Sequence, residues 1–393
     1  MNDIGKVMTV LKKHFPLEEW LDKMGDSRKR PQIPTATIAW MVVEMVVRGQ
    51  KSLLAVDQAA RLPGTLYYYG SKRAMVASDT TMQRSLAGFA VGAVHEVLWD
   101  LGRRLLKLPE TRVTLPSGRK ARVGIVDGSQ WGDDPGSALM VSGDQMDAVV
   151  GYRMSPGRGH ELETTRALLS QANEVYGRGW ADYVVTDGLY MTEKDFQTAR
   201  EWGHYLVVKT KEETLGVIED ARGLFFGPGG PVEGVEVVKG FDSVRNEEYE
   251  VIGCGGFQWH GLKLKVAYVR EKAVKPRRDG RKEEPFWVIT TDEDVTLEDM
   301  RALAHGRWHV ENDGFRTLNQ LVGSKRRLTS DAVVREALLG LWLIGLGLLE
   351  YYAWKCRKLL KRGPLGKAKR TMRWLGERFE ELIRQAYALE RTG

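Results

Sequence analysis

Val123-Gly124-Ile125-Val126-Asp127-Gly128-Ser129 is an apolar, β-rich run that stops abruptly at an acid and a glycine. Tyr183-Val184-Val185-Thr186-Asp187-Gly188-Leu189-Tyr190 repeats this design further along the chain. Both patterns predict buried strands with an aspartate at the carboxyl end. In an open α/β sheet ligands bind outside that end of the strands. If the two strands are neighbours, Asp127 and Asp187 therefore lie side by side at a ligand-binding edge.

The segments around these two strands alternate between strand-like and helical patterns. Two apolar, strand-like segments follow the first run. After them come a helical pattern, the second run, another helical pattern and a last short strand. The ranges are 138–142 and 148–153 for the early strands, 160–176 and 192–202 for the helices, and 204–209 for the last strand. This order resembles a ribonuclease-H-like core, a mixed sheet flanked by helices.

A third acid follows in the stretch Gly306-Arg307-Trp308-His309-Val310-Glu311-Asn312-Asp313-Gly314-Phe315-Arg316. Arg307 precedes Glu311 by about one helical turn, and aromatic residues flank both. Cutting or joining a phosphodiester requires a pair of divalent ions, held by a few carboxylates. Magnesium prefers oxygen ligands and usually draws them from distant parts of a chain. Asp127, Asp187 and Glu311 are the candidates for such a set.

This constellation resembles the DDE transposases of bacterial insertion sequences, in particular the insertion-sequence-four-like group. That group has a ribonuclease-H-like core with a β-rich insertion before the last acid, and the resemblance covers roughly residues 120 to 350. Its third-acid signature is Tyr, two residues, Arg, three residues, Glu, six residues, Lys. Arg307 and Glu311 match it, whereas Ala304 and Leu318 stand at the Tyr and Lys positions. The second-acid pattern, Asp-Gly-x-Tyr, is intact at residues 187–190.

The resemblance implies a cut-and-paste DNA transposase in which Asp127, Asp187 and Glu311 hold two Mg²⁺ or Mn²⁺ ions. Such an enzyme nicks each element end with water, and the freed 3′-hydroxyl then attacks target DNA. Arg307 would position a phosphate near the metals. Other candidates for contact with DNA or phosphate are Tyr190, Arg316, Asn319, Lys325 and Arg326. The implied partners are double-stranded DNA, as terminal inverted repeats and as target, and a second copy of the chain. The implied location is the nucleoid in a prokaryotic cytoplasm.

Each of these residues also has a plainer structural interpretation. Asp127 and Asp187 precede glycines and could simply cap turns. Arg307 and Glu311 could form a surface i,i+4 ion pair worth a few tenths of a kcal/mol. The motif His160-Glu161-x-Glu163 suggests metal ligands, but we interpret it as a solvated first turn of a helix because no partner ligand is visible.

Two other functions remain as alternatives. One is a transposase-derived DNA-binding protein without cleavage activity, which the missing Tyr and Lys of the signature favour. The other is a hydrolase with a carboxylate pair, such as a glycosidase, which needs no metal.

Composition agrees with a DNA partner without deciding it. The chain has 393 residues, with 59 Lys and Arg against 52 Asp and Glu, and a net charge of +7.

The two cysteines, Cys254 and Cys356, cannot form a disulfide framework, and no Cys/His spacing resembles a zinc site. Residues 1–17 lack the pattern of a secretion signal. The apolar run 337–349 is too short for a bilayer, so we expect a buried helix and a soluble protein without membrane contact.

These patterns predict an α/β fold: a ribonuclease-H-like mixed sheet flanked by helices, with a β-rich insertion before the third acid and an N-terminal helical domain. The segments are a helical, DNA-binding region (1–115), the first part of the core (116–211), the insertion (212–284), the second part of the core (285–354) and a basic helical tail (355–393).

The N-terminal region could read DNA directly. A short helix at 52–60, a loop at 63–73 with tyrosines and basic residues, and a long helix at 78–106 could form a helix-turn-helix. The alternative is a plain helical scaffold, because the connection is long for that motif.

Basic and aromatic residues elsewhere offer further contacts. The stretch 270–282 would suit a phosphate track, and residues 355–373 contain nine basic and no acidic residues. In relatives of this group an aromatic of the insertion holds a flipped base, for which Trp259 and Trp287 are the candidates here, with a core position as the alternative for each.

Overall fold

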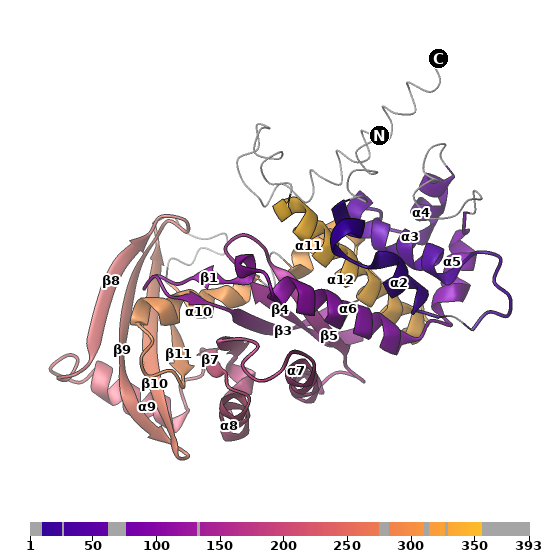
Figure 1. Cartoon of the computed structure of the whole chain (residues 1–393). Coiled ribbons are helices and arrows are strands. Elements are labelled where there is room, and N and C mark those ends of the chain that lie inside the picture. Colours follow the sequence, from indigo (N-terminus) through magenta and orange to yellow (C-terminus); the bar gives the residue numbers. More distant parts are fainter. Residues whose placement is uncertain are drawn as a thin grey trace.

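The computed structural model describes residues 10–25, 27–61, 76–131, 134–274, 283–309, 314–326 and 329–355, and within these ranges a nine-stranded mixed sheet is the central element (Figure 1). Its strand order is β5-β4-β3-β6-β7-β11-β10-β9-β8. The strands are β3 (Val123–Trp131), β4 (Asp134–Ser142), β5 (Ala148–Met154), β6 (Tyr183–Asp187), β7 (Tyr205–Thr210), β8 (Glu236–Asp242), β9 (Glu247–Trp259), β10 (Leu262–Ala273) and β11 (Phe286–Thr290).

The first five strands form the predicted core. β3, β4 and β5 are joined as antiparallel neighbours, and β6 and β7 then continue the sheet in parallel with β3. This is the expected ribonuclease-H-like order, and the prediction of a mixed α/β fold is confirmed. The interior of β6 is buried on both faces, as its run of apolar and β-branched residues predicts.

The β-rich insertion continues the same sheet. β11, which follows the insertion in sequence, pairs antiparallel with β7 on one side and with β10 on the other. β10 and β9 form a long hairpin, and β8 is the edge strand. The insertion also contains a helix that the sequence analysis missed, α9 (Gly216–Phe225), whose buried apolar residues have helical spacing.

Helices cover both faces of the core strands. On one face, α7 (Glu161–Tyr176) and α8 (Glu193–Glu201) enclose a cavity that Val184 and Thr186 of β6 line. On the other face lies α10 (Leu297–His309), where a β-carbon on Gly306 would be 3.6 Å from the Ile125 side chain of β3. Because side chains alternate along a strand, Tyr183, Val185 and Asp187 point towards the α10 face.

A long apolar helix, α12 (Ala332–Lys355), joins the N-terminal helices to the sheet. It packs against α3 (Thr35–Arg48), α6 (Val91–Leu106) and β5, which confirms the buried helix predicted at residues 337–349. The whole helix has 24 residues, so the sequence analysis underestimated its length. Within the described residues it is the one helix long and apolar enough to cross a membrane, but 78% of its most apolar window is buried inside the fold.

The predicted long helix at 78–106 is in fact two helices. Ser78 caps α5 (Asp79–Leu86), and its Oγ accepts a hydrogen bond from Thr81 N at 3.2 Å. The helix is interrupted between Leu86 and the start of α6. At the break the backbone of Gly88 lies against Ser27, where a β-carbon would be 2.7 Å from the Ser27 nitrogen. A contact from a distant segment therefore sets the break, and the local pattern does not reveal it.

Some predicted features lie outside the described residues. They are the loop at 63–73, most of the basic stretch 270–282, the tail beyond Lys355, and Glu311. The short helix predicted before that loop is α4 (Leu53–Ala60), and Ser52 caps it.

Candidate active site

Asp127 lies within β3, so the prediction that its strand ends at the acid is wrong. β3 continues to Trp131 because β4 turns back along it, with Asp127 paired to Ala138. The parallel pairing with β6, however, spans only Val123 to Ile125. Asp127 is thus paired with β4 on one side, whereas on the other side it lies beyond the last residue that pairs with β6.

Asp187 is the last residue of β6, as predicted. The register pairs Ile125 of β3 with Val185 of β6, two residues before each acid. Both side chains therefore leave the sheet at the same edge and on the same face. Asp187 Oδ1 also accepts a hydrogen bond from Leu189 N at 3.0 Å, so the turn-capping role foreseen for it is present too.

Arg307 reaches Asp127 from α10. Its Nη1 donates to Asp127 Oδ1 at 3.1 Å and to Oδ2 at 3.2 Å, and the two side chains are 22% and 14% exposed. Hydrogen bonds between ionised groups are stronger than neutral ones, and this pair is largely shielded from water. The ion pair thereby connects α10 to the edge of the sheet that carries the two aspartates. Glu311 lies outside the described residues.

Tyr190 is buried beside the acids, in the short 3₁₀ turn that follows Asp187. Burial raises the pKa of its hydroxyl, and the negative charges of Asp187, Glu161 and Asp127 raise it further, whereas the nearby Thr165 hydroxyl lowers it. Tyr190 therefore stays protonated, as a neutral group within electrostatic reach of three carboxylates.

Glu161, at the start of α7, is the residue the sequence analysis rejected. Its Oε1 lies over Gly128, where a β-carbon would be only 2.0 Å away. Partial desolvation of its carboxyl raises the pKa of Glu161, although the residue as a whole is exposed, and the charge of Asp187 adds to the rise. The signal was present in the motif His160-Glu161-x-Glu163, although His160 and Glu163 pair with each other, at 3.1 Å.

We predict that Glu161→Gln stabilises the protein at pH 8. The pKa of Glu161 is raised in the folded state, so ionising it opposes folding above that pKa and has little effect when the carboxyl is protonated in both states. The gain in unfolding free energy should therefore shrink as the pH falls towards 4, which urea unfolding at both pH values measures. The exposed Glu163→Gln variant is the control, and a gain independent of pH would contradict the electrostatic cause.

Lys209 is a second residue the sequence analysis missed. It pairs with Asp187 in the register of β6 and β7, is 9% exposed, and its Nζ lies 3.9 Å from the centre of the Phe286 ring. Burial lowers its pKa to about 8, helped by the charge of Arg307 and opposed by that of Glu271. Only the strand register brings this lysine beside Asp187, and the register is not readable from local sequence.

The other predicted contacts lie on and after α11 (Arg316–Val322). Arg316, Lys325 and Arg326 are exposed. Asn319 also has a structural role, because its Oδ1 accepts a hydrogen bond from Lys325 N at 3.1 Å and closes the turn after the helix. The two departures from the family signature, Ala304 and Leu318, are fully buried, so core packing accounts for their apolar character.

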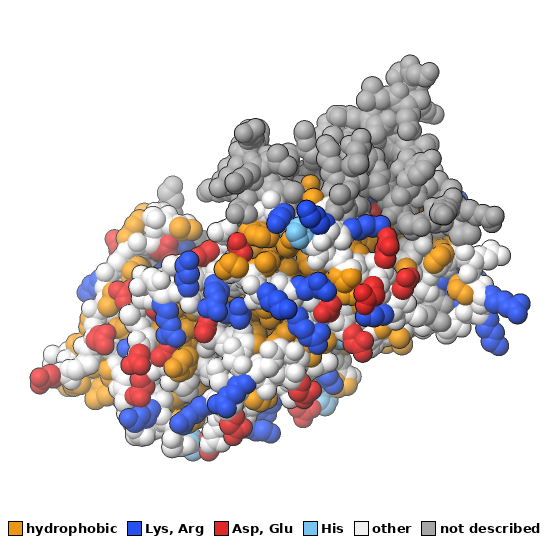
Figure 2. Space-filling model, viewed as in Figure 1, with side chains coloured by type: hydrophobic (Ala, Val, Ile, Leu, Met, Phe, Trp, Pro, Cys, Tyr) orange, Lys and Arg blue, Asp and Glu red, His pale blue; other side chains and the backbone are white. Residues whose placement is uncertain are grey.

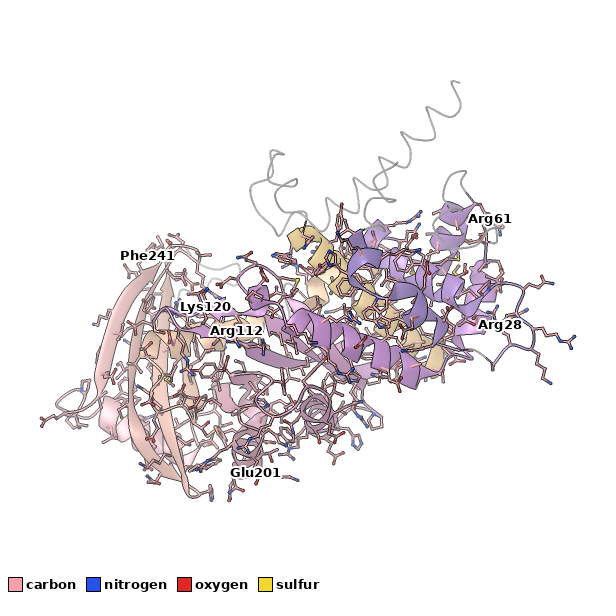
Figure 3. The ribbon with its side chains drawn as sticks, in the orientation of Figure 1. Arg28, Arg61, Arg112, Lys120, Glu201 and Phe241 are labelled. Carbon is pink, nitrogen blue, oxygen red and sulfur yellow. The ribbon has the colours of Figure 1, made fainter. Side chains whose placement is uncertain are left out.

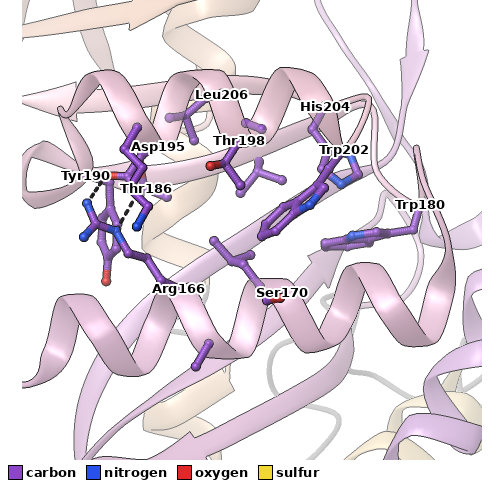
Figure 4. A pocket seen from close by; sticks show the side chains of 15 residues that line it. Arg166, Ser170, Trp180, Thr186, Tyr190, Asp195, Thr198, Trp202, His204 and Leu206 are labelled. Carbon is purple, nitrogen blue, oxygen red and sulfur yellow. Dashed lines mark hydrogen bonds and ion pairs between the residues drawn. The ribbon is translucent and has the colours of Figure 1, made fainter.

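A cavity of about 340 Å³ lies between α7 and α8, and Tyr190 is one of the residues that line it (Figure 4). The ion pair of Arg166 with Asp195 closes one end, with Nε to Oδ1 at 2.7 Å, and Trp180 and Trp202 lie at the other. The cavity lies on the opposite face of β6 from Asp187, and neither aspartate of the candidate site lines it.

The donor set fits a hard divalent cation in part. Within the described ranges, no three His, Cys, Asp or Glu side chains are grouped to hold a metal. Asp127 and Asp187 nevertheless supply two carboxylates at one edge, the oxygen ligands that magnesium prefers. Arg307 already balances the charge of Asp127 with a cation. A third ligand would have to come from outside these ranges, as Glu311 would.

A family model described as Transposase DDE domain matches residues 119–346, which include Asp127, Asp187 and Arg307. Among solved structures, the chain is similar to one described as piggyBac transposase synaptic complex with hairpin DNA. The identity is 13% and the TM-score 0.45, over 98% of this chain and 82% of that one. No curated protein matches the chain.

Proposed function

Because the chain belongs to the Transposase DDE domain family, we propose that it is an active DNA transposase that cuts element ends and joins the 3′-hydroxyl to target DNA. The observation that carries the proposal is the convergence of Asp127, Asp187 and Arg307 at one edge of the sheet. A DNA-binding protein without cleavage activity has no need of that convergence, so we place it second.

Each residue has a role in the proposed reaction. Asp127 and Asp187 would hold Mg²⁺ or Mn²⁺, with Glu311 as the third ligand. Two bound ions would activate the attacking oxygen and stabilise the leaving one. Arg307 would move from Asp127 to a DNA phosphate and hold it in line, a positioning role. Further contacts with phosphate are proposed for Tyr190, Arg316, Asn319, Lys325 and Arg326.

Surface charge supports a DNA partner. Lys and Arg side chains gather across the middle of the face in Figure 2, and Figure 3 labels Arg112 and Lys120 in this region. Near these two in the sequence, the exposed basic residues are Arg103 and Arg104 in the last turn of α6, Lys107 after it, and Arg119 and Lys120 before β3. Neutralising DNA phosphates with such residues makes binding fall steeply with salt.

Three finer proposals accompany this function. The intact Asp-Gly-x-Tyr pattern and the Arg307 and Glu311 spacing support the insertion-sequence-four-like group. We also propose a homodimer assembled on two DNA ends, and a place in the nucleoid of a prokaryotic cell.

Cleavage of linear DNA tests the proposal. Fragments that carry the sequences flanking the coding region should be nicked at the element ends in Mg²⁺ and left intact in EDTA. Binding without nicking at every Mg²⁺ and Mn²⁺ concentration would support the inactive alternative. Turnover of any substrate in EDTA would support the metal-independent hydrolase instead.

We predict that Mn²⁺ stabilises the wild-type protein. A ligand at about 100 times its Kd adds about 2.7 kcal/mol to the unfolding free energy if it binds only the folded state. Scanning calorimetry should therefore show a higher Tm in Mn²⁺ than in EDTA, and Asp187→Asn should remove most of the difference. An equal rise in the variant would place the bound ion elsewhere.

A further inference from the structure

A buried cluster of charged residues joins the insertion to α10. Glu271 of β10 is 1% exposed, and its Oε1 accepts hydrogen bonds from Arg301 Nε at 2.7 Å and from His305 Nε2 at 2.5 Å. Arg301 also donates through Nη2 to Asp242 Oδ2 at 3.1 Å, at the end of β8. One carboxylate of the insertion thus binds two side chains that are four residues apart on α10.

The protonation states suit this arrangement. Burial lowers the pKa of His305 to about 4, so its imidazole is neutral and its Nε2–H can donate to Glu271. Burial opposes ionisation of Glu271, but the hydrogen bonds from His305 and Arg301 hold its pKa below the ordinary value. Glu271 is therefore an ionised acceptor between a neutral donor and a cation.

Aromatic rings fix the two donors from the side. The Arg301 guanidinium lies 4.2 Å from the centre of the Tyr249 ring, and Tyr249 pairs with Glu271 across β9 and β10. The His305 ring meets Phe286 of β11 edge-on at 5.7 Å. The side chains of Arg301 and His305 are thus held in one orientation relative to the sheet. Helix α10, which carries both, is held in the same way.

We propose that Glu271 is a positioning residue of the active site, which sets the rotation and axial placement of α10 and so delivers Arg307 to Asp127. Arg307 lies only two residues beyond His305 on the same helix. A rotation or slide of α10 about the sheet would move Arg307 away from the 3.1 and 3.2 Å contacts with Asp127. The insertion therefore acts on the catalytic edge through α10.

The alternative is a cluster that only stabilises the fold. Buried ion pairs are often replaceable without loss of stability, so stability alone is weak evidence for their role. Positioning predicts a selective change at α10 and in the rate of the chemical step. General stabilisation predicts a loss spread over the whole sheet.

The test compares Glu271→Gln with Glu250→Gln in the full chain. Glu250 of β9 forms ion pairs with Lys239 at 2.7 Å and Arg270 at 3.5 Å, so it is a carboxylate of the same sheet outside the cluster. In hydrogen exchange, amides of residues 297–309 should exchange at least tenfold faster in Glu271→Gln and at the wild-type rate in Glu250→Gln. Amides of β3 and β6 should stay protected in both variants.

The second measurement rests on the proposed function. In Glu271→Gln, the single-turnover nicking rate at saturating DNA should fall at least tenfold while the Kd for DNA stays within twofold. Unchanged exchange at α10, or equal acceleration in β3 and β6, would overturn the proposal. If Glu271→Gln does not fold, Asp242→Asn removes the outer contact and should show the same selective pattern at smaller size. If wild-type protein cleaves no DNA, the proposed function fails and exchange alone decides the positioning role.

Discussion

Asp187→Asn should lower the rate of DNA nicking about a thousandfold. Asparagine keeps the shape of the side chain and its turn-capping oxygen but removes the negative charge that would hold a divalent ion. Loss of metal stabilisation at the transition state costs several kcal/mol, and about 4 kcal/mol corresponds to three powers of ten. DNA affinity should stay within a few-fold, because binding depends on basic side chains elsewhere.

The measurement is single-turnover nicking of an end fragment at saturating protein, with affinity determined separately in EDTA. Asp220→Asn on the exposed face of α9 is the matched control and should cleave at the wild-type rate. Nicking by Asp187→Asn within tenfold of wild type would remove Asp187 from the site. Glu311→Gln, which likewise removes one negative charge, extends the test to the third proposed ligand.

Gly345→Ala should lower the unfolding free energy by about 2 kcal/mol. Alanine normally favours a helix over glycine, yet here α12 crosses α3 so closely that a β-carbon would be 2.7 Å from the Val43 carbonyl oxygen. Backbone cannot yield as a side chain can, so the helices must separate, and overpacking of this kind costs about 1–3 kcal/mol.

Gly223→Ala in α9 is the matched control. A β-carbon at that position meets nothing within 4 Å, so the same substitution should stabilise the protein by up to about 1 kcal/mol. Urea unfolding of both variants gives the two signs. A stabilised Gly345→Ala variant would mean that α3 and α12 are not in close contact.

Local sequence predicted the elements whose signals are local. The β6 strand with Asp187 at its end and the buried helix around Gly345 follow from pattern and composition, and the structure has both. Thr296, directly before α10, is a further local feature, and its Oγ1 caps the helix by accepting a hydrogen bond from Asp299 N at 3.1 Å. These features depend on a few neighbouring residues.

Features that depend on distant segments could not be predicted in this way. β3 passes Asp127 because β4 returns along it, and the helix before α6 breaks where Ser27 packs on Gly88. The same holds for Glu161 and Lys209, which reach the acids through packing and register. For Lys209 no local pattern indicates that proximity, whereas Glu161 stood in a motif that we interpreted as a solvated helix turn.

The position of β11 has a consequence for biosynthesis. A ribosome releases β3 to β7 and the whole insertion before residues 286–290 emerge, yet that strand lies between β7 and β10. Until it is synthesised, both of its neighbours have an unpaired edge, which is a template for association between chains. The nascent protein therefore has a period of exposure to aggregation, and truncation before residue 286 should yield insoluble product.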